Sequence, residues 1–289
     1  MALEVAARLA DAGRPSELVS VDAMQVYRGM DIGTAKPSAD ERQRVAHHLI
    51  DLVEPSHDFS LAEFRDAATR TLDEIDGRRA TAILVGGTGL YVRAIVDRLE
   101  IPGTWPDIRR RLEDEAERSG SEVLHERLRV ADPVAASRME PSNGRRIVRA
   151  LEVVEGSGRP FSSFGPGLDA YPESAVVQVA LRWPRAVLSR RIEQRVDRMF
   201  DAGLVDEVRS LMIRGLSRTA AQALGYKEII EHLEGRSSLA EARSEIVLRT
   251  RQFAVRQERW FRRDPRVSWF DVEVDPVSEV APRVLALLT

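Results

Sequence analysis

A group of polar residues follows a short apolar run near the start of the chain, and their types could support acid–base chemistry. Residues 17–21 read as a strand, and this run ends at the carboxylate of Asp22. Polar side chains then recur as far as Lys36. In open α/β sheets, ligands bind at the carboxyl ends of the strands, because loops and helix N-termini meet there. Spacing alone is equally compatible with an ordinary strand and a surface loop.

A second candidate is the glycine turn at residues 86–89, which carries one hydroxyl at Thr88. The apolar run before it, residues 80–85, is typical of a parallel strand that is buried on both faces. A helix is predicted over residues 90–99, so strand, turn and helix repeat the topology of a ligand-facing loop. The glycines are compatible with a simple tight turn or with a place where a substrate approaches the backbone.

These residues must be positioned by an α/β core, and the pattern of elements predicts one that is interrupted. Residues 104–167 contain short helical patterns without a strand, which predicts an inserted helical domain. The core then consists of residues 1–103 and 168–289, with a parallel sheet flanked by helices. Glycine and proline clusters at residues 156–160 and 165–167 close the insertion and suit a lobe that moves as a unit.

The last helix of the insertion, residues 143–155, begins with a cluster of arginines: Arg145, Arg146 and Arg149. Cations at a helix N-terminus oppose the helix dipole. We therefore favour an external anion, such as a phosphate, over helix stability as the reason for this cluster.

The C-terminal third of the chain is basic and mostly helical. Residues 182–266 carry a formal charge of +7, whereas residues 1–181 carry −7. A basic surface of this kind is expected where a protein meets a polyanion, although a solvated helical surface has the same composition. Helices are predicted over residues 220–233 and 239–261, and we assign Phe253 of the second to the core because a stripe at helical spacing usually packs inward.

Composition limits the class of protein. The chain has 289 residues, 43% of them hydrophobic, and no cysteine, which excludes a disulfide framework and a thiolate metal site. No apolar run approaches the ~18 residues of a membrane span, and no targeting segment is visible. We expect a cytoplasmic protein that does not contact a membrane.

Motifs along nearly the whole chain resemble those of the tRNA dimethylallyltransferases (tRNA isopentenyltransferases). Residues 20–37 resemble the family's signature, and further motifs follow in the family's order at residues 47–51, 64–66, 86–91, 145–153, 225–226 and 250–257. The family's phosphate-binding loop, G-x-x-x-x-G-K-[ST], has no counterpart in this sequence. Residues 1–9 resemble the helix that follows that loop.

The resemblance implies a P-loop NTPase-like core with a bound nucleotide such as ATP, Mg²⁺ as cofactor, and a monomer. It also implies a reaction, the transfer of a dimethylallyl group from dimethylallyl diphosphate to N6 of the adenosine 3′-adjacent to the anticodon of a tRNA. Asp22 is our candidate base, because a carboxylate with a pKa of ~3.9 is ionised at neutral pH and can take the amine proton. Thr88 and Arg195 are the candidates for stabilising the diphosphate leaving group.

Residue by residue, the resemblance implies contacts with the anticodon stem-loop in three parts of the chain. The implied contacts are Asp22, Ala23, Met24, Gln25 and Thr88; Arg109, Arg145, Arg146, Ile147, Val148 and Arg149; and Gln222, Ala223, Leu224, Gly225, Tyr226 and Lys227. The wider basic surface would hold the stem through its phosphates, which positions the RNA without specifying its sequence.

Two alternatives compete with this interpretation. The first is a prenyltransferase that acts on free adenine nucleotides, which would not need the basic C-terminal third. The second is a catalytically impaired tRNA-binding remnant, because the phosphate loop is absent. We expect an upstream reading frame to encode that loop. We expect residues 1–289 alone to bind stem-loops but to transfer the prenyl group poorly or not at all, with unpaired backbone groups at the strand of residues 18–21 and its neighbours.

Overall fold

The computed structural model describes residues 1–165, 167, 168 and 170–288, so that 166 and 169, which border the predicted end of the insertion, and 289 lie outside the described residues. The chain divides into two compact units. Unit 1 comprises Met1–Val96 and Glu173–Thr289, and unit 2 comprises Asp97–Pro172. The helical insertion predicted at residues 104–167 lies within unit 2.

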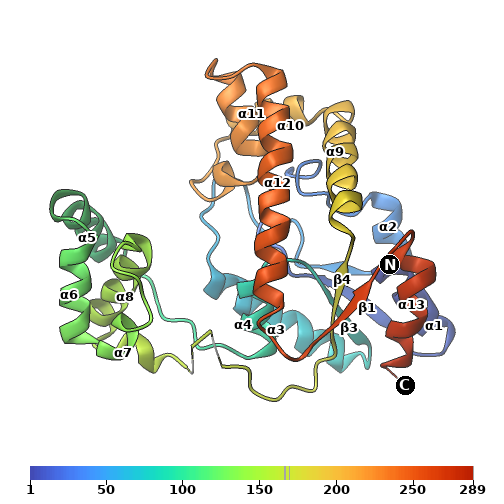
Figure 1. The fold of residues 1–289 in the computed structure, drawn as a ribbon. Coiled ribbons are helices and arrows are strands. Elements are labelled where there is room, and N and C mark those ends of the chain that lie inside the picture. The colour runs from blue at the N-terminus through green and yellow to red at the C-terminus, as the bar shows by residue number, and fades with distance from the viewer. Residues whose placement is uncertain (166, 169, 289) are drawn as a thin grey trace. The chain divides into compact units, whose positions relative to one another are not determined.

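Unit 1 contains parallel strands, in agreement with the predicted α/β class. The first sheet has the order β2-β1-β3, in which β1 (Ser16–Ser20) pairs with β2 (His47–His48) and with β3 (Thr81–Val85). A second pair joins β4 (Gln178–Arg182) to β5 (Val267–Asp271), again in parallel (Figure 1). Because β1 has a neighbour on each side, the expectation of unpaired backbone groups is wrong for the strand of residues 18–21 itself. It holds for the neighbouring β3, which pairs with β1 alone among the described residues.

The strand β3 differs from its prediction. Its side chains are half-buried rather than buried on both faces, and Val85 is 41% exposed. Within the described residues, β3 pairs with β1 alone, so the side chains along its other edge have no neighbouring strand to cover them.

Helices surround the strands of unit 1. Helix α3 begins with a capping box, since the side chains of Ser60 and Glu63 each accept a hydrogen bond from the other's backbone N–H. The long helix α12 packs against α9, α11 and α4 (Figure 1). The helices of this unit are α1 (Ala2–Asp11), α2 (Ala39–Arg44), α3 (Leu61–Gly77), α4 (Gly89–Val96), α9 (Arg185–Asp201), α10 (Leu204–Arg214), α11 (Tyr226–Leu233), α12 (Leu239–Phe261) and α13 (Pro276–Ala286).

Two predictions about the C-terminal helices are wrong. The helix predicted at residues 220–233 is divided into a 3-10 turn, Ala220–Gln222, and α11, because Gly225 adopts a φ of +90° and interrupts the helix. Phe253 of α12 is 41% exposed beside Arg256 and is not a core residue. Ile246 on the same stripe belongs to the core, but at the turn that carries Phe253 it is Ala254 that packs against the core.

Unit 2 is helical throughout its described residues. It consists of α5 (Pro106–Ser119), α6 (Ser121–Ala131), α7 (Pro133–Ala136), α8 (Gly144–Ser157) and the 3-10 turn Phe161–Ser163. Leu112, Leu124 and Leu128 form its core together with apolar residues of α8. In neither unit does the described chain contain a helix with the length and apolar character that a membrane span requires.

Candidate functional site

Asp22 begins the turn that leaves β1. Its Oδ1 accepts hydrogen bonds from the backbone N–H groups of Met24 (2.8 Å) and Gln25 (3.3 Å). These bonds form an Asx turn, which fixes the carboxylate at the carboxyl end of the strand. The other oxygen, Oδ2, receives no hydrogen bond from the described residues, so it is the one that can accept a proton from a substrate.

The glycine turn brings Thr88 next to Asp22. The backbone N–H of Ala23 donates to Thr88 Oγ1 at 3.2 Å, and Val21 N–H donates to the Val85 carbonyl at 2.7 Å. A Cβ at Gly86 would collide with the carbonyl of Val21. Close approach of two backbones therefore requires the first glycine, and this contact carries the hydroxyl of Thr88 to the end of β1.

Helix α12 supports the same turn, a contribution that sequence reasoning missed. Gln257 Nε2 donates to the Gly87 carbonyl at 3.0 Å, and a Cβ at Gly87 would collide with the Gln257 amide. A Cβ at Gly89 would likewise collide with the Trp260 indole. Gln257 ends the motif at residues 250–257, but nothing in the sequence indicated that this helix packs against the glycine turn.

Arg195 on α9 completes the group of predicted catalytic residues. Its side chain remains exposed, yet the protein around its guanidinium lowers its pKa, and Arg198 adds to this effect. The nearby carboxylate of Asp22 acts in the opposite direction and raises the pKa. The structure thus places Thr88 at the turn of Asp22, and Arg195 lies near enough for the charge of Asp22 to act on its pKa, while the catalytic roles of the three residues stay predictions.

Gln25 is a linker inside the loop of residues 22–36. Its Oε1 accepts from the Ser20 hydroxyl at 2.7 Å. Its Nε2 donates to the carbonyls of Thr34 (3.1 Å) and Ala35 (3.4 Å). Both ends of the amide are therefore used within the protein, and Gln25 joins the end of β1 to the far side of the loop. Ala23 and Met24, also predicted to contact RNA, are half-buried beside it.

The residues predicted to contact RNA at positions 222–227 differ in their exposure to solvent. Gln222 and Lys227 are exposed, Leu224 is half-buried and Gly225 is buried. The side chains of Ala223 (3% exposed) and Tyr226 (0%) lie in the core. These two side chains are not accessible to RNA in this conformation, while the contact of residues 222–227 with RNA stays a prediction.

In unit 2, two of the predicted RNA-contacting arginines bind a buried carboxylate. Glu152 is 0% exposed, and its oxygens accept from the Trp105 backbone N–H (2.8 Å) and the Arg109 guanidinium (2.7 and 2.9 Å) and lie 3.0 Å from Arg149 Nη1. Burial raises the pKa of Glu152, but these hydrogen bonds outweigh it and lower the pKa overall. The expectation that an external anion holds Arg149 is therefore wrong, because Glu152 is its partner.

The remaining residues of this predicted segment also separate by burial. Ile147 (0% exposed) and Val148 (5%) pack in the core of unit 2, so their side chains are not RNA contacts in this conformation. Arg145 and Arg146 are exposed at the start of α8, and neither has a carboxylate partner among the described residues. These two arginines are therefore the cations of α8 that can meet a phosphate.

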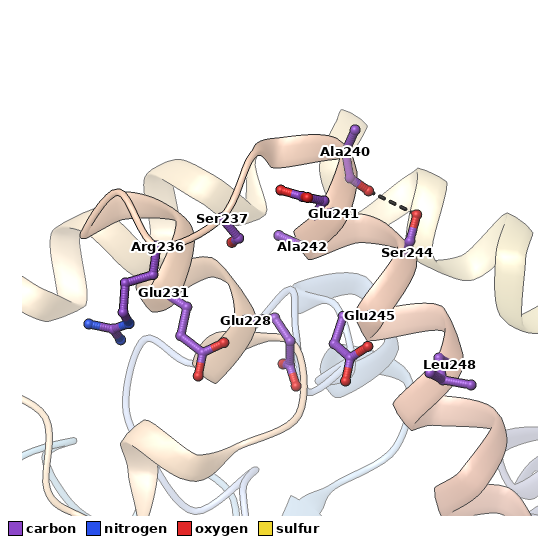
Figure 2. A pocket seen from close by; sticks show the side chains of 10 residues that line it. All are labelled: Glu228, Glu231, Arg236, Ser237, Ala240, Glu241, Ala242, Ser244, Glu245 and Leu248. Carbon is purple, nitrogen blue, oxygen red and sulfur yellow. Dashed lines mark hydrogen bonds between the residues drawn. The ribbon is translucent and has the colours of Figure 1, made fainter.

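A cavity of about 580 Å³ lies between α11 and α12 (Figure 2), and its walls are acidic. Glu228 accepts from the Gly225 N–H, Glu241 from the Ser238 N–H, and Glu245 pairs with Arg249. The lining consists of Glu228, Glu231, Arg236, Ser237, Ala240, Glu241, Ala242, Ser244, Glu245 and Leu248. Because these carboxylates would repel phosphates, we exclude this cavity as the RNA or diphosphate site.

The family model for IPP transferase matches residues 25–264, which is most of the chain. The chain belongs to the IPP transferase family. Among relatives of this IPP transferase, the tRNA dimethylallyltransferase of Streptomyces coelicolor is 51% identical over 94% of this chain and 87% of its own length. The tRNA dimethylallyltransferase of a Nocardioides species is 49% identical over 99% of this chain and 91% of its own.

Solved structures show the same relationship at the level of the fold. The crystal structure of the tRNA isopentenylpyrophosphate transferase from Bacillus halodurans has a TM-score of 0.69 with this IPP transferase and 39% identity. The comparison covers 99% of this chain and 91% of that one. The resemblance based on motifs is therefore confirmed, and the α/β fold is that of the family.

Proposed function

We propose that this protein transfers a dimethylallyl group from dimethylallyl diphosphate to N6 of the adenosine 3′-adjacent to the anticodon of tRNA, as a monomer in the cytoplasm. The observation that carries the proposal is the meeting of Asp22, Thr88 and Arg195 at the carboxyl end of β1. A proton acceptor, a hydroxyl and a cation are the groups that this displacement needs.

Asp22 is the proposed base. The adenine amine attacks the allylic carbon of the prenyl group, the bond from that carbon to the diphosphate oxygen breaks, and pyrophosphate leaves. The amine proton becomes acidic as the new C–N bond forms, so it passes to a carboxylate in the same step. Because Oδ1 of Asp22 is held by two backbone N–H groups, Oδ2 is presented in a fixed direction for this transfer.

Arg195 and Thr88 are the proposed partners of the leaving group, which gains negative charge as the bond breaks. Mg²⁺ would neutralise part of that charge when bound. Within the described residues, no cluster of three or more acidic or histidine side chains forms a metal cage. Mg²⁺ commonly binds through substrate phosphates, waters and one or two protein oxygens, so the hydroxyl of Thr88 would fit an ion carried by the diphosphate.

The exposed cations are the proposed RNA contacts. Arg145 and Arg146 on α8 and Lys227 on α11 can reach phosphates, which position the stem-loop, and the neutral but exposed Gln222 can donate to phosphates or sugars. The target base must leave its stack before its N6 reaches Asp22, at a cost of a few kcal/mol that interactions in the site offset.

The test is direct prenyl transfer. The protein is incubated with dimethylallyl diphosphate, Mg²⁺ and an anticodon stem-loop with adenosine at the 3′ side of the anticodon, and the nucleosides are then identified by mass spectrometry. We expect N6-(dimethylallyl)adenosine from this RNA, in low yield because residues 1–289 contain no phosphate-binding loop, and none from a matched stem-loop with guanosine there. Modification of free adenosine monophosphate at a rate equal to that of the stem-loop would contradict tRNA as the substrate.

A further inference from the structure

Glu207 on α10 is bound by a loop that lies far from it in the sequence. Its Oε2 accepts from the backbone N–H groups of Asp31 (3.1 Å) and Ile32 (2.9 Å), and its Oε1 accepts from Gly33 (3.4 Å). Three consecutive N–H groups thus converge on one carboxylate. Charge-assisted bonds of this kind are stronger than neutral ones, so Glu207 fixes the backbone of this loop segment.

Tyr226 completes the attachment from the other side. Its hydroxyl donates to Glu207 Oε1 at 2.6 Å, and its side chain is 0% exposed. A Cβ at Gly33 would collide with the Tyr226 ring, so the ring lies directly against the loop backbone. Burial and the neighbouring Glu207 raise the pKa of Tyr226, which keeps its hydroxyl a proton donor at neutral pH.

The loop transmits this attachment to the proposed site. The carbonyls of Thr34 and Ala35, which follow the held segment, accept hydrogen bonds from Gln25 Nε2. The backbone N–H of Gln25 in turn donates to Asp22 Oδ1. A continuous series of hydrogen bonds therefore runs from Glu207 through the loop and Gln25 to the carboxylate of Asp22.

A second anchor holds the end of the loop but lies outside this series. Lys36 Nζ, whose side chain is 1% exposed, pairs with Asp31 (2.8 Å) and Asp51 (2.6 Å) and also donates to the Tyr27 carbonyl. These bonds preserve the general path of the loop when Glu207 is altered. A change at Glu207 is therefore expected to displace the loop slightly and not to unfold it.

We propose that Glu207, together with Tyr226, is a positioning residue that acts through the loop of residues 31–35 and Gln25 to set the direction of the Asp22 carboxylate. This inference rests on the proposed function, because the direction of Asp22 matters only if it takes a proton from the substrate. It also gives the buried Tyr226 a role other than RNA contact.

The experiment compares three single variants with the wild-type protein. Glu207→Gln keeps the size of the side chain but removes its charge and places an amide donor against N–H groups. Tyr226→Phe removes one hydroxyl. Asp206→Asn is the matched control, because this exposed neighbour on α10 pairs with Arg209 and not with the loop. Each protein is measured by hydrogen exchange of residues 22–36, by affinity for the anticodon stem-loop and by single-turnover transfer.

We expect Glu207→Gln to speed exchange in residues 22–36 and to lower the single-turnover rate about 10- to 100-fold, the usual effect of misplacing a reacting group. Affinity for the stem-loop should stay within a few-fold. Tyr226→Phe should give a smaller change in the same direction, and Asp206→Asn should match the wild type. Combining Glu207→Gln with Gln25→Ala should lower the rate by less than the product of the single effects, because both act through one series of hydrogen bonds.

Unchanged hydrogen exchange of residues 22–36 in both Glu207→Gln and Tyr226→Phe would show that these two side chains do not hold the loop. Faster hydrogen exchange in residues 22–36 with an unchanged single-turnover rate would overturn the positioning role. So would a double variant with Gln25→Ala whose rate falls by the full product of the single effects. If Glu207→Gln fails to fold, Tyr226→Phe decides alone. A wild-type protein that transfers no prenyl group overturns the proposed function and the positioning role in that reaction, whereas the exchange data still report separately on the attachment.

Discussion

Two glutamates, one in each unit, accept hydrogen bonds from backbone N–H groups but differ in the charge of their other partners. Glu152 in unit 2 is buried and binds one N–H group and two guanidinium groups. Glu207 in unit 1 binds three consecutive N–H groups of a loop and a tyrosine hydroxyl, with no cation. The carboxylate of Glu152 therefore neutralises charge inside a helical unit, whereas that of Glu207 shapes a loop. Loss of Glu152 should thus affect stability, and loss of Glu207 should affect the reaction.

The comparison also sorts the arginines of unit 2. Arg109 and Arg149 bind Glu152, so they contribute to the fold of this unit, although both are themselves among the predicted RNA contacts. Arg145 and Arg146 are exposed on the same helix without such a partner. The RNA-binding role proposed for α8 therefore depends on these two side chains.

The largest effect is expected at Asp22, whose Oδ1 shapes a turn and whose Oδ2 is the proposed proton acceptor. Asp22→Asn keeps an oxygen that can accept from the Met24 and Gln25 N–H groups, so the turn should persist. The proton acceptor is lost, and single-turnover transfer should fall ~100-fold or more with stem-loop affinity within a few-fold. A near-normal transfer rate would remove Asp22 from the role of base.

Removal of Glu152 tests the other half of the comparison. Glu152→Ala leaves two guanidinium groups and one N–H group without their acceptor, and breaking a buried pair costs ~3–5 kcal/mol when the partner is also buried. Since Arg109 and Arg149 retain partial access to water, we expect a loss of about 2 kcal/mol in the free energy of unfolding, measured with denaturant.

The matched control for this variant is Glu126→Ala in the same unit. Glu126 forms an exposed pair with Arg129, and such pairs contribute ~0–1 kcal/mol. Equal losses in the two variants would show that burial of Glu152 is not what gives it its importance.

Local sequence signals predicted much of the frame of the site. The strand that ends at Asp22, the glycine turn that carries Thr88 and the capping box of Ser60 and Glu63 all follow from residues within a few positions of one another. The α/β class and the helix α12 were likewise visible in the hydrophobic pattern.

The parts that the sequence did not reveal depend on packing between distant segments. Glu207 lies about 175 positions from the loop that it holds, and Gln257 lies 170 positions from Gly87. No local pattern distinguishes such a glutamate from one on a solvated helix face. The exposure of Phe253 also depends on which elements happen to cover α12, a property of packing that its stripe does not contain.

A smaller effect is expected from the exposed arginines of α8. Replacing Arg145 and Arg146 by Ala should weaken stem-loop binding and flatten the dependence of log affinity on log salt by roughly one unit for each phosphate that the variant no longer binds. Arg129→Ala, which removes an arginine already paired with Glu126, should leave that slope nearly unchanged. Measurement at several salt concentrations decides this, and equal slopes in all variants would contradict phosphate binding by α8.

The smallest effect is expected on the free energy of unfolding at acidic pH, and it follows from the lowered pKa of Glu152. Burial alone would raise this pKa, but the Trp105 N–H, Arg109 and Arg149 lower it below its ordinary value of 4.5. The unfolded chain therefore binds a proton at a higher pH than the folded one does. The contribution of the ionised Glu152 carboxylate to stability is fully present above pH ~4.5 and is lost as the pH falls through the pKa of Glu152 in the folded protein.

In Glu152→Gln, residue 152 cannot change its charge in this range, so the free energy of unfolding of this variant lacks the pH dependence that Glu152 contributes. We expect the difference in unfolding free energy between the wild type and Glu152→Gln to be constant from pH 7 to about 5 and to shrink below about 4.5. Denaturant unfolding at each pH measures it. Asp132, a second buried carboxylate of unit 2 with a lowered pKa, is present in both proteins, so its own loss of stability cancels in this difference. A difference that stays constant down to about pH 3 would show that the charge of Glu152 contributes no pH-dependent stability to unit 2.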